Sequence, residues 1–191
     1  MKRARQGAHV TYCQGAFPQP SSLFQTVQDE VSWEHKEVTV MGRRVMQPRM
    51  VAYMADDTSM QYTYSHTTLS PHAWTPGVAA IKETVEQIAD HKFNSCLLNL
   101  YRTGSDHLSW HSDNEALYGD EPVIGSVSLG AARSFMLRRN SDHKDKRHFL
   151  VGAGDVLVMS GTTQQHWMHS VPKRARVAEA RINLTFRNIL P

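Results

Sequence analysis

The chain has 191 residues, of which 40% are hydrophobic and 20% charged, and it carries a formal net charge of +3. These values are typical of one globular domain, and no segment approaches the roughly 18 consecutive apolar residues that a membrane helix needs. Cys13 and Cys96 are too few for a disulfide framework, and the basic start at 1–5 is not followed by the apolar stretch of a secretory signal. We therefore expect an intracellular, monomeric protein that has no membrane partner.

The predicted elements begin after a glycine- and proline-rich segment, 1–25, which is expected to be a loosely ordered lead-in. A short helix is predicted at 23–31. Residues 37–53 alternate in polarity and turn at Gly42, as in a β-hairpin. A longer helix is predicted at 77–92, because its apolar residues recur at helical spacing behind a threonine and a proline.

The second half of the chain consists of short apolar runs that are separated by turn residues. Such runs with glycine-rich turns are typical of strands in a sandwich or jelly roll, and not of alternating βαβ units. The fold class is therefore predicted as mainly β with flanking helices. The predicted strands are 95–101, 123–129, 134–138, 148–151, 155–160 and 181–187.

His111 and Asp113 are separated by one residue, so that on extended backbone both side chains lie on one face and can reach one ion. One more histidine would complete the triad of non-haem Fe(II) oxygenases, which leaves positions open for a chelating acid and O2. A His-x-Asp pair alone is common, and His143 and His166 compete with His169 as the third ligand. The strand that follows His169 favours this residue.

In that strand, polar and apolar residues alternate strictly, and Arg181, Asn183, Thr185 and Arg187 lie on the same face. Two arginines on the inward face of a barrel strand are unfavourable to bury unless an anion binds there, and guanidinium groups suit carboxylates. A dicarboxylic acid fits this pattern. The alternative is an edge strand whose arginines lie in solvent.

A second strand offers polar side chains that suit the same ligand. Within 95–101, Asn99 and Tyr101 lie on one face. Their amide and phenol groups are able to hydrogen-bond a carboxylate, although buried Asn and Tyr side chains commonly bond backbone groups instead. The strand alone does not distinguish these two roles.

Taken in order, these motifs resemble the AlkB family of Fe(II)- and 2-oxoglutarate-dependent dioxygenases. The resemblance covers 37–190 and implies a single dioxygenase domain over 1–191. Its core is expected to be a double-stranded β-helix, or jelly roll, at 95–190, under an N-terminal nucleotide-recognition lid at 37–75. The motifs are Asn99-x-Tyr101 with Gly104, His111-Ser112-Asp113, His169-Ser170-Val171-Pro172 and Arg181-Ile182-Asn183-Leu184-Thr185-Phe186-Arg187.

The resemblance implies Fe(II) as cofactor, with 2-oxoglutarate and O2 as co-substrates. In the implied reaction, 2-oxoglutarate is decarboxylated to succinate and an Fe(IV)-oxo species hydroxylates the alkyl group of an N-alkylated base, of the 1-methyladenine or 3-methylcytosine type. Formaldehyde then leaves and the unmodified base returns. The implied iron ligands are His111, Asp113 and His169, and the implied 2-oxoglutarate contacts are Asn99, Tyr101, Arg181, Thr185 and Arg187.

The substrate contacts that the resemblance implies lie mostly in the lid. A base inside a duplex cannot reach the iron, so it must be flipped out and stacked, and Tyr62 and Tyr64 either stack on it or belong to the core. Met41 would be the wedge that fills the gap in the duplex. Asn114 stands where many DNA-repair members have Asp. The full set is Met41, Gly42, Arg43, Arg49, Tyr62, Tyr64 and Asn114.

Lysines and arginines are concentrated at 138–148 and 173–187, as in solvated loops or in a surface that binds phosphates. With a nucleic acid implied as substrate, we expect phosphate contacts there. The first hypothesis is a dioxygenase that repairs alkylated DNA, either single- or double-stranded. The second is the same chemistry on methylated RNA, and the third is a non-catalytic jelly roll that binds a metal or a nucleic acid.

Overall fold

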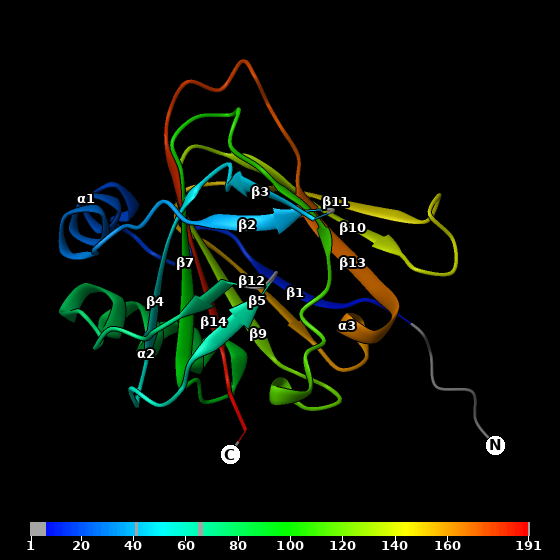
Figure 1. Ribbon diagram of the computed structural model, residues 1–191, viewed down its shortest axis with the longest axis horizontal. Coiled ribbons are helices and arrows are strands. Elements are labelled where there is room, and N and C mark those ends of the chain that lie inside the picture. The colour runs from blue at the N-terminus through cyan, green and yellow to red at the C-terminus, as the bar shows by residue number, and fades with distance from the viewer. Residues whose placement is uncertain (1–6, 41, 65–66, 191) are drawn as a thin grey trace.

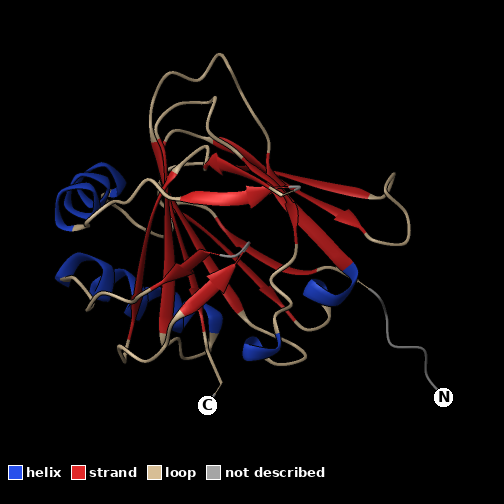
Figure 2. Cartoon of the chain, in the orientation of Figure 1, coloured by secondary structure: helices blue, strands red, loops and turns tan. Residues whose placement is uncertain are grey.

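The computed structural model describes residues 7–40, 42–64 and 67–190. Two antiparallel sheets face each other, and helices cover the outer face of the larger sheet (Figures 1 and 2). The larger sheet has the strand order β1-β12-β9-β14-β7-β4, and the smaller one has the order β11-β10-β13-β8. The prediction of a mainly β, jelly-roll fold with flanking helices is confirmed.

The central strand of the larger sheet is β14, which pairs along its length with β7 on one side and β9 on the other. Ile182, Leu184 and Phe186 pack into the core beneath the helices, so the opposite face of β14 points between the sheets. An edge strand with its arginines in solvent is therefore excluded. The strands of this sheet are β1 (His9–Cys13), β4 (Met50–Ala55), β7 (Ser95–Tyr101), β9 (Ile124–Gly130), β12 (Asp155–Ser160) and β14 (Arg181–Arg187).

The smaller sheet contains two strands that the periodicity did not predict, β8 and β13. They pair antiparallel, with His111 opposite His169, and the register shifts between His169 and Val171. Two separate hairpins, β2–β3 and β5–β6, complete the strands in the described ranges. The bounds are β8 (Leu108–His111), β10 (Arg133–Arg139), β11 (Lys146–Val151), β13 (Trp167–Val171), β2 (Glu37–Val40), β3 (Arg43–Met46), β5 (Tyr62–Tyr64) and β6 (Thr67–Leu69).

The helices are α1 (Pro20–Glu30), α2 (Pro76–Ala89), the short α3 (Thr163–His166) and the 3-10 helix η1 (Ala116–Tyr118). As predicted, α2 begins behind a threonine, since the Thr75 hydroxyl accepts a hydrogen bond from the Val78 N–H at 3.4 Å. Its buried apolar side chains pack on the larger sheet, and each contributes about 1.5–3 kcal/mol through burial. No helix in the described part of the chain is long and apolar enough to span a membrane.

The expected loosely ordered lead-in is wrong over its described part. All five residues of β1 pair with β12, from His9 opposite Ser160 to Cys13 opposite Val156, and α1 starts at Pro20. A five-residue strand docked on an existing sheet edge gains a full row of backbone hydrogen bonds, which local glycine and proline content does not reveal. Residues 1–6 lie outside the described residues.

The predicted lid at 37–75 is interrupted by β4, which lies between the two hairpins in sequence but belongs to the larger sheet. Most of β4 is buried, because its side chains enter the cores on both faces of the sheet. The covering elements are therefore the hairpins β2–β3 and β5–β6, which lie in front of the sheets in Figure 1.

Two loops meet at the top of Figure 1, the β7–β8 loop (102–107) and the β13–β14 loop (172–180). The Gly104 N–H donates to the Val177 carbonyl at 2.8 Å, and the Arg174 N–H donates to the Gly104 carbonyl at 2.7 Å. A Cβ atom at position 104 would overlap the Arg174 carbonyl oxygen. This close approach requires glycine at position 104.

We expect Gly104→Ala to force the two loops apart and to lower the thermal midpoint. Overpacking of this kind costs about 1–3 kcal/mol, which corresponds to roughly 2–10 °C for a chain of this length. Gly152→Ala is the matched control, because a Cβ there would meet its nearest neighbour at an ordinary 3.5 Å. Calorimetry that gives the same midpoint for both variants would contradict the loop contact.

Candidate active site

The structure brings His111, Asp113 and His169 together at the end of the smaller sheet. The Nε2 atoms of His111 and His169 lie 3.8 Å and 4.0 Å from the two Asp113 carboxylate oxygens. One potential ligand atom from each residue lies within 4.8 Å of the others, and the described residues contain no second cluster of this kind. The competing candidates His143 and His166 do not belong to it. Two imidazoles and one carboxylate are the ligand set of non-haem iron.

A hydrogen bond orients the imidazole of His111 for a metal, and burial keeps that of His169 neutral. The Nδ1 atom of His111 lies 2.9 Å from the Ser109 carbonyl, so a proton on Nδ1 leaves the Nε2 lone pair directed toward Asp113. Burial, to which the neighbouring His111 adds, lowers the pKa of His169 to about 3. His169 is therefore neutral at physiological pH, as a metal ligand must be.

Asp113 is a buried carboxylate that stays ionised. Burial raises the pKa of Asp113, but the charge of the neighbouring Arg187 and its hydrogen bonds to the carboxylate hold that pKa well below its usual range. The Nε and Nη2 atoms of Arg187 donate to Oδ2 at 3.1 Å and 2.7 Å. The Asp113 N–H donates to Gln164 Oε1 at 2.9 Å. Sequence reasoning missed Gln164, a buried amide in α3 that carries no motif signal.

At the other end of β14, Arg181 and Tyr101 lie opposite each other in register. Arg181 is 1% exposed, and its Nη2 donates to the Ser128 hydroxyl at 2.8 Å. Its Nε and Nη1 atoms and the Tyr101 hydroxyl are buried, and none of them makes a hydrogen bond of acceptable geometry within the described residues. Burial lowers the pKa of Arg181 to about 10, although the phenol of Tyr101 opposes this shift. Buried donors without acceptors fit a carboxylate ligand.

The remaining predicted co-substrate contacts lie between these two ends. Asn99 lies opposite Asn183, and the Thr185 hydroxyl donates to Asn183 Oδ1 at 3.1 Å. Arg49, which the sequence suggests as a phosphate or base contact, is buried instead, and its Nε donates to Asn99 Oδ1 at 2.6 Å. An arginine held by an amide inside the pocket is not available to a phosphate on the surface. Arg49 therefore lines the cavity beside Asn99.

A single cavity of about 900 Å³ opens between the sheets and the hairpins, and includes the triad, Asn99, Tyr101, Thr185 and Arg187 in its lining. Arg181 lies behind this lining, with its Cζ atom 5.2 Å from the centre of the Tyr101 ring. The lid contributes apolar side chains, of which Val45 and Met46 are 42% and 51% exposed. The cavity is large enough for a small acid and a nucleobase together.

Tyr62 lies at the boundary between a small core and the cavity. Its ring packs against Tyr53 and Tyr118 in a small core, and it also lines the cavity. Its hydroxyl donates to Glu115 Oε1 at 3.2 Å. The second carboxylate oxygen of Glu115 is buried with no hydrogen-bond partner in the described residues.

Asn114, which the resemblance implies as a substrate contact, does not line the cavity. Its side chain is exposed and does not line the cavity, whereas that of the next residue, Glu115, does. The chain leaves β8 before the triad carboxylate, so the alternation of a strand no longer tells which neighbour points inward. The only sign of Glu115 in the sequence was that it is an acidic residue two positions after Asp113.

The other predicted substrate residues lie at the edge of the lid or outside the described structure. Gly42 turns the β2–β3 hairpin with a φ of +74°, and Arg43 is exposed at the start of β3. Met41 lies outside the described residues, as does the side chain of Tyr64, whose backbone belongs to β5.

The predicted basic surface is smaller than its sequence suggests. Arg139 and Arg147 both pair with Asp145, and Arg174 donates to the Ser134 hydroxyl at 2.7 Å. Arg181 and Arg187 are buried in the site. The exposed cations that remain in these stretches are Lys144, Lys146, Lys173 and Arg176.

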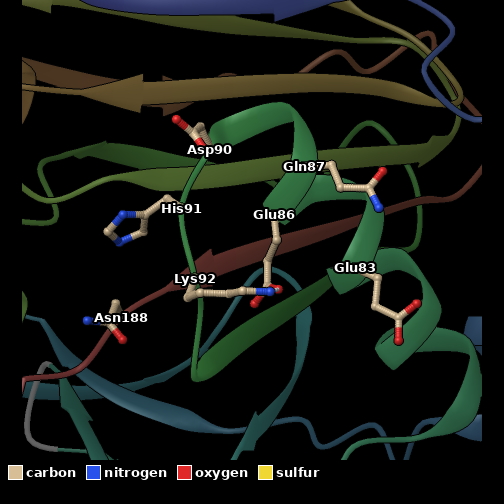
Figure 3. Close-up of a pocket in the computed structure, with 7 residues that line it drawn as sticks. All are labelled: Glu83, Glu86, Gln87, Asp90, His91, Lys92 and Asn188. Carbon is tan, nitrogen blue, oxygen red and sulfur yellow. Dashed lines mark hydrogen bonds and ion pairs between the residues drawn. The ribbon is translucent and has the colours of Figure 1, made fainter.

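A second hollow lies outside the site, beside the end of α2 (Figure 3). Its buried carboxylate, Glu86, accepts hydrogen bonds from the Lys92 ammonium at 2.6 Å and from the Phe93 N–H at 3.0 Å. These bonds join the end of the helix to the start of β7, which is a structural role. The hollow is lined by Glu83, Glu86, Gln87, Asp90, His91, Lys92 and Asn188.

Comparison with known proteins agrees with this geometry. The model of the 2OG-Fe(II) oxygenase superfamily matches residues 10–187. Alpha-ketoglutarate-dependent dioxygenase alkB homolog 3 of Bos taurus is 34% identical over 96% of this chain and 67% of its own length. DNA oxidative demethylase ALKBH2 of Mus musculus is 35% identical over 88% of this chain and 74% of its own length.

A solved structure, that of OsALKBH1, covers 95% of this chain and 97% of its own with a TM-score of 0.68, and at 16% identity it shows the same fold. The sequence relatives go further, since they cover most of the chain at more than 30% identity, and the superfamily match covers residues 10–187. The chain therefore belongs to the AlkB family of Fe(II)- and 2-oxoglutarate-dependent dioxygenases.

Proposed function

We propose that this protein demethylates N-alkylated bases in DNA, of the 1-methyladenine and 3-methylcytosine type, by oxidising the alkyl group with O2 and 2-oxoglutarate. The observation that carries the proposal is the shared cavity, which contacts the His-Asp-His triad and Tyr101. Tyr101 packs against Arg181, whose Nε and Nη1 atoms have no hydrogen-bond partner in the described residues. Relatives named DNA oxidative demethylases at 33–36% identity favour DNA over RNA as the substrate.

The residues of the site fall into groups that would bind the metal, 2-oxoglutarate and the nucleobase. His111, Asp113 and His169 would hold Fe(II), which supplies O2 activation when bound. Arg181 and Tyr101 would bind the distal carboxylate of 2-oxoglutarate through their free donors. Arg187 keeps Asp113 ionised and oriented, so it acts through the ligand it contacts.

The base would enter from the side of the hairpins. Since the triad lines a cavity between the sheets and the hairpins, a base in a duplex must be flipped out of the stack to reach it. Tyr62 offers a ring for stacking. The unpaired oxygen of Glu115 offers an acceptor for the exocyclic amino group of a methylated adenine or cytosine, and a negative charge that favours these cationic bases.

We expect Glu115→Gln to slow demethylation by about tenfold to a hundredfold, because a charged hydrogen bond of about 1.5–3 kcal/mol is lost. Asn114→Asp should change both rates less than about twofold, since the side chain points to solvent and its charge is screened. The measurement is turnover of 1-methyladenine and 3-methylcytosine oligonucleotides. Slowing or acceleration by much more than about twofold from Asn114→Asp, with no slowing from Glu115→Gln, would contradict this assignment.

The exposed cations should contact phosphates outside the cavity. We expect Lys173→Ala with Arg176→Ala to reduce the salt dependence of binding to a single-stranded oligonucleotide. The slope of log affinity against log salt should fall by about 1.4, at roughly 0.7 per phosphate contact. Arg147→Ala, whose charge already pairs with Asp145, is the matched control, and equal slopes in all three proteins would refute the phosphate contacts.

The proposal is tested by mass spectrometry of methylated oligonucleotides, supplied as single- and double-stranded DNA and as RNA, with and without 2-oxoglutarate. We expect the methylated DNA to lose about 14 mass units, the mass of one methylene group, only when 2-oxoglutarate is present. If the protein repairs RNA in preference to DNA, the proposed DNA substrate is wrong and methylated RNA takes its place. A failure on every oligonucleotide by protein that binds Fe(II) and 2-oxoglutarate would refute nucleobase demethylation.

A further inference from the structure

Arg133, the first residue of β10, is a buried arginine that pairs with no carboxylate in the described part of the chain. It is 1% exposed. Its Nη1 donates to the Thr103 carbonyl at 3.3 Å, and its Nη2 donates to the Asp106 and Pro172 carbonyls at 2.8 Å and 2.9 Å. The Asp106 carboxylate itself is bound by Arg102. Buried cations are normally paired, so an arginine held only by neutral carbonyls needs an explanation.

The same guanidinium group lies against the co-substrate end of the site. The Cζ atoms of Arg133 and Arg181 lie 5.5 Å and 5.2 Å from the centre of the Tyr101 ring. Each contact is within the range of a cation–π interaction. Both cations are buried and neither forms an ion pair within the described residues. This region therefore carries two buried cations, and the Asp106 carboxylate, which is already paired with Arg102, offsets the charge of Arg133 only in part.

Arg133 also joins the two loops that close this end of the molecule. Its carbonyl partners Thr103 and Asp106 belong to the β7–β8 loop, and Pro172 begins the β13–β14 loop. These are the loops that meet at Gly104. One side chain thus fixes the loops, contacts the Tyr101 ring and adds charge beside Arg181.

We infer that Arg133 is a positioning residue that makes the co-substrate site selective for a dicarboxylate. It acts through Tyr101 and Arg181: it holds the phenol in place and supplies a second positive charge near the distal carboxylate. It does not contact the end of the acid that chelates iron. This inference rests on the proposed function, in which Tyr101 and Arg181 bind that distal carboxylate.

The test compares two acids that differ only at the distal end. 2-Oxoglutarate and 2-oxopentanoate have the same chelating group and the same number of carbons, but the second has a methyl group where the first has its distal carboxylate. Each is titrated anaerobically into the Fe(II)-loaded protein, and binding is followed by the visible charge-transfer band. The ratio of the two affinities measures recognition of the distal carboxylate alone.

We expect Arg133→Met to weaken 2-oxoglutarate by about tenfold and 2-oxopentanoate by less than about twofold, as loss of one buried cation near the carboxylate predicts. Arg133→Lys retains the charge without the planar fork, so it should recover part of the ratio. The affinity for Fe(II) without the acid should not change in either variant. A purely structural role for Arg133 would weaken both acids equally.

Equal weakening of the two acids, or no change in either, overturns the inference. If Arg133→Met does not fold, Arg133→Lys alone tests the inference. A folded Lys variant that binds both acids more weakly but keeps the normal ratio of their affinities also overturns it. Arg181→Met in the same assay separates the two proposals. If Arg181→Met leaves the ratio unchanged, the proposed carboxylate site is wrong; if it removes the preference while the Arg133 variants keep it, only the role of Arg133 is wrong.

Discussion

Replacing Arg181 with methionine should reduce the affinity for 2-oxoglutarate by about a hundredfold or more, without lowering the stability of the protein that lacks the acid. A charged hydrogen bond to a carboxylate contributes about 1.5–3 kcal/mol. Without the acid, however, two guanidinium nitrogens of Arg181 are buried without acceptors. An apolar side chain of similar length removes that unfavourable burial.

The two effects are measured separately, by anaerobic titration of 2-oxoglutarate and by thermal unfolding of the protein without it. Ser128→Ala is the control, because it removes the hydroxyl that accepts from Arg181 Nη2 but keeps the charge. It should weaken 2-oxoglutarate far less than Arg181→Met does. A large loss of stability in Arg181→Met, with normal affinity for the acid, would mean that Arg181 is a structural cation.

Asp113→Ala should abolish turnover and also destabilise the fold. The carboxylate is one of three ligands in the triad, and its removal leaves two imidazoles to hold Fe(II). It is also the partner of Arg187, which is 5% exposed. A buried cation that loses its partner lowers the free energy of unfolding by about 3–5 kcal/mol. Turnover and thermal unfolding of the variant check the two effects.

A double variant separates the ion pair from the metal. In Asp113→Ala with Arg187→Met no buried charge remains unpaired, so we expect the thermal midpoint to recover most of the loss while turnover stays absent. If the double variant is as unstable as Asp113→Ala, the ion pair with Arg187 is not the cause of the instability. Turnover by Asp113→Ala at the normal rate would exclude the carboxylate as an iron ligand.

The sequence predicted those elements whose local pattern is regular. The bounds of β7, β12 and β14 match the predicted strands, because each is buried on a sheet and bounded by turn residues. The helix α2 has a capping threonine, a proline and a continuous apolar face. The spacing of His111 and Asp113 was informative for the same reason, because the proximity of two residues in one short segment can be predicted without knowing the tertiary fold.

Features that depend on distant contacts were missed. The strands β8 and β13 are short and carry the ligands, so polar residues interrupt their apolar pattern. Gln164 supports Asp113 from 51 positions away, and no local spacing announces such a contact. The burial of Arg49 depends on the folded sheets, where its Nε donates to Asn99, 50 positions away. Arg139 and Arg147 pair with Asp145 over only six and two positions, in the turn between β10 and β11, and a count of charges alone does not reveal this pairing. Charge counts along a sequence therefore overestimated the free basic surface.

The most direct test of the proposed demethylation measures both products in one reaction. Purified protein is incubated with Fe(II), O2, 2-oxoglutarate and a DNA oligonucleotide that contains 1-methyladenine, and succinate and repaired adenine are quantified together. We predict equal amounts of the two products, and neither product above background with His111→Ala. Succinate formed at the same rate without the oligonucleotide, while the methylated base stays intact, would contradict the account.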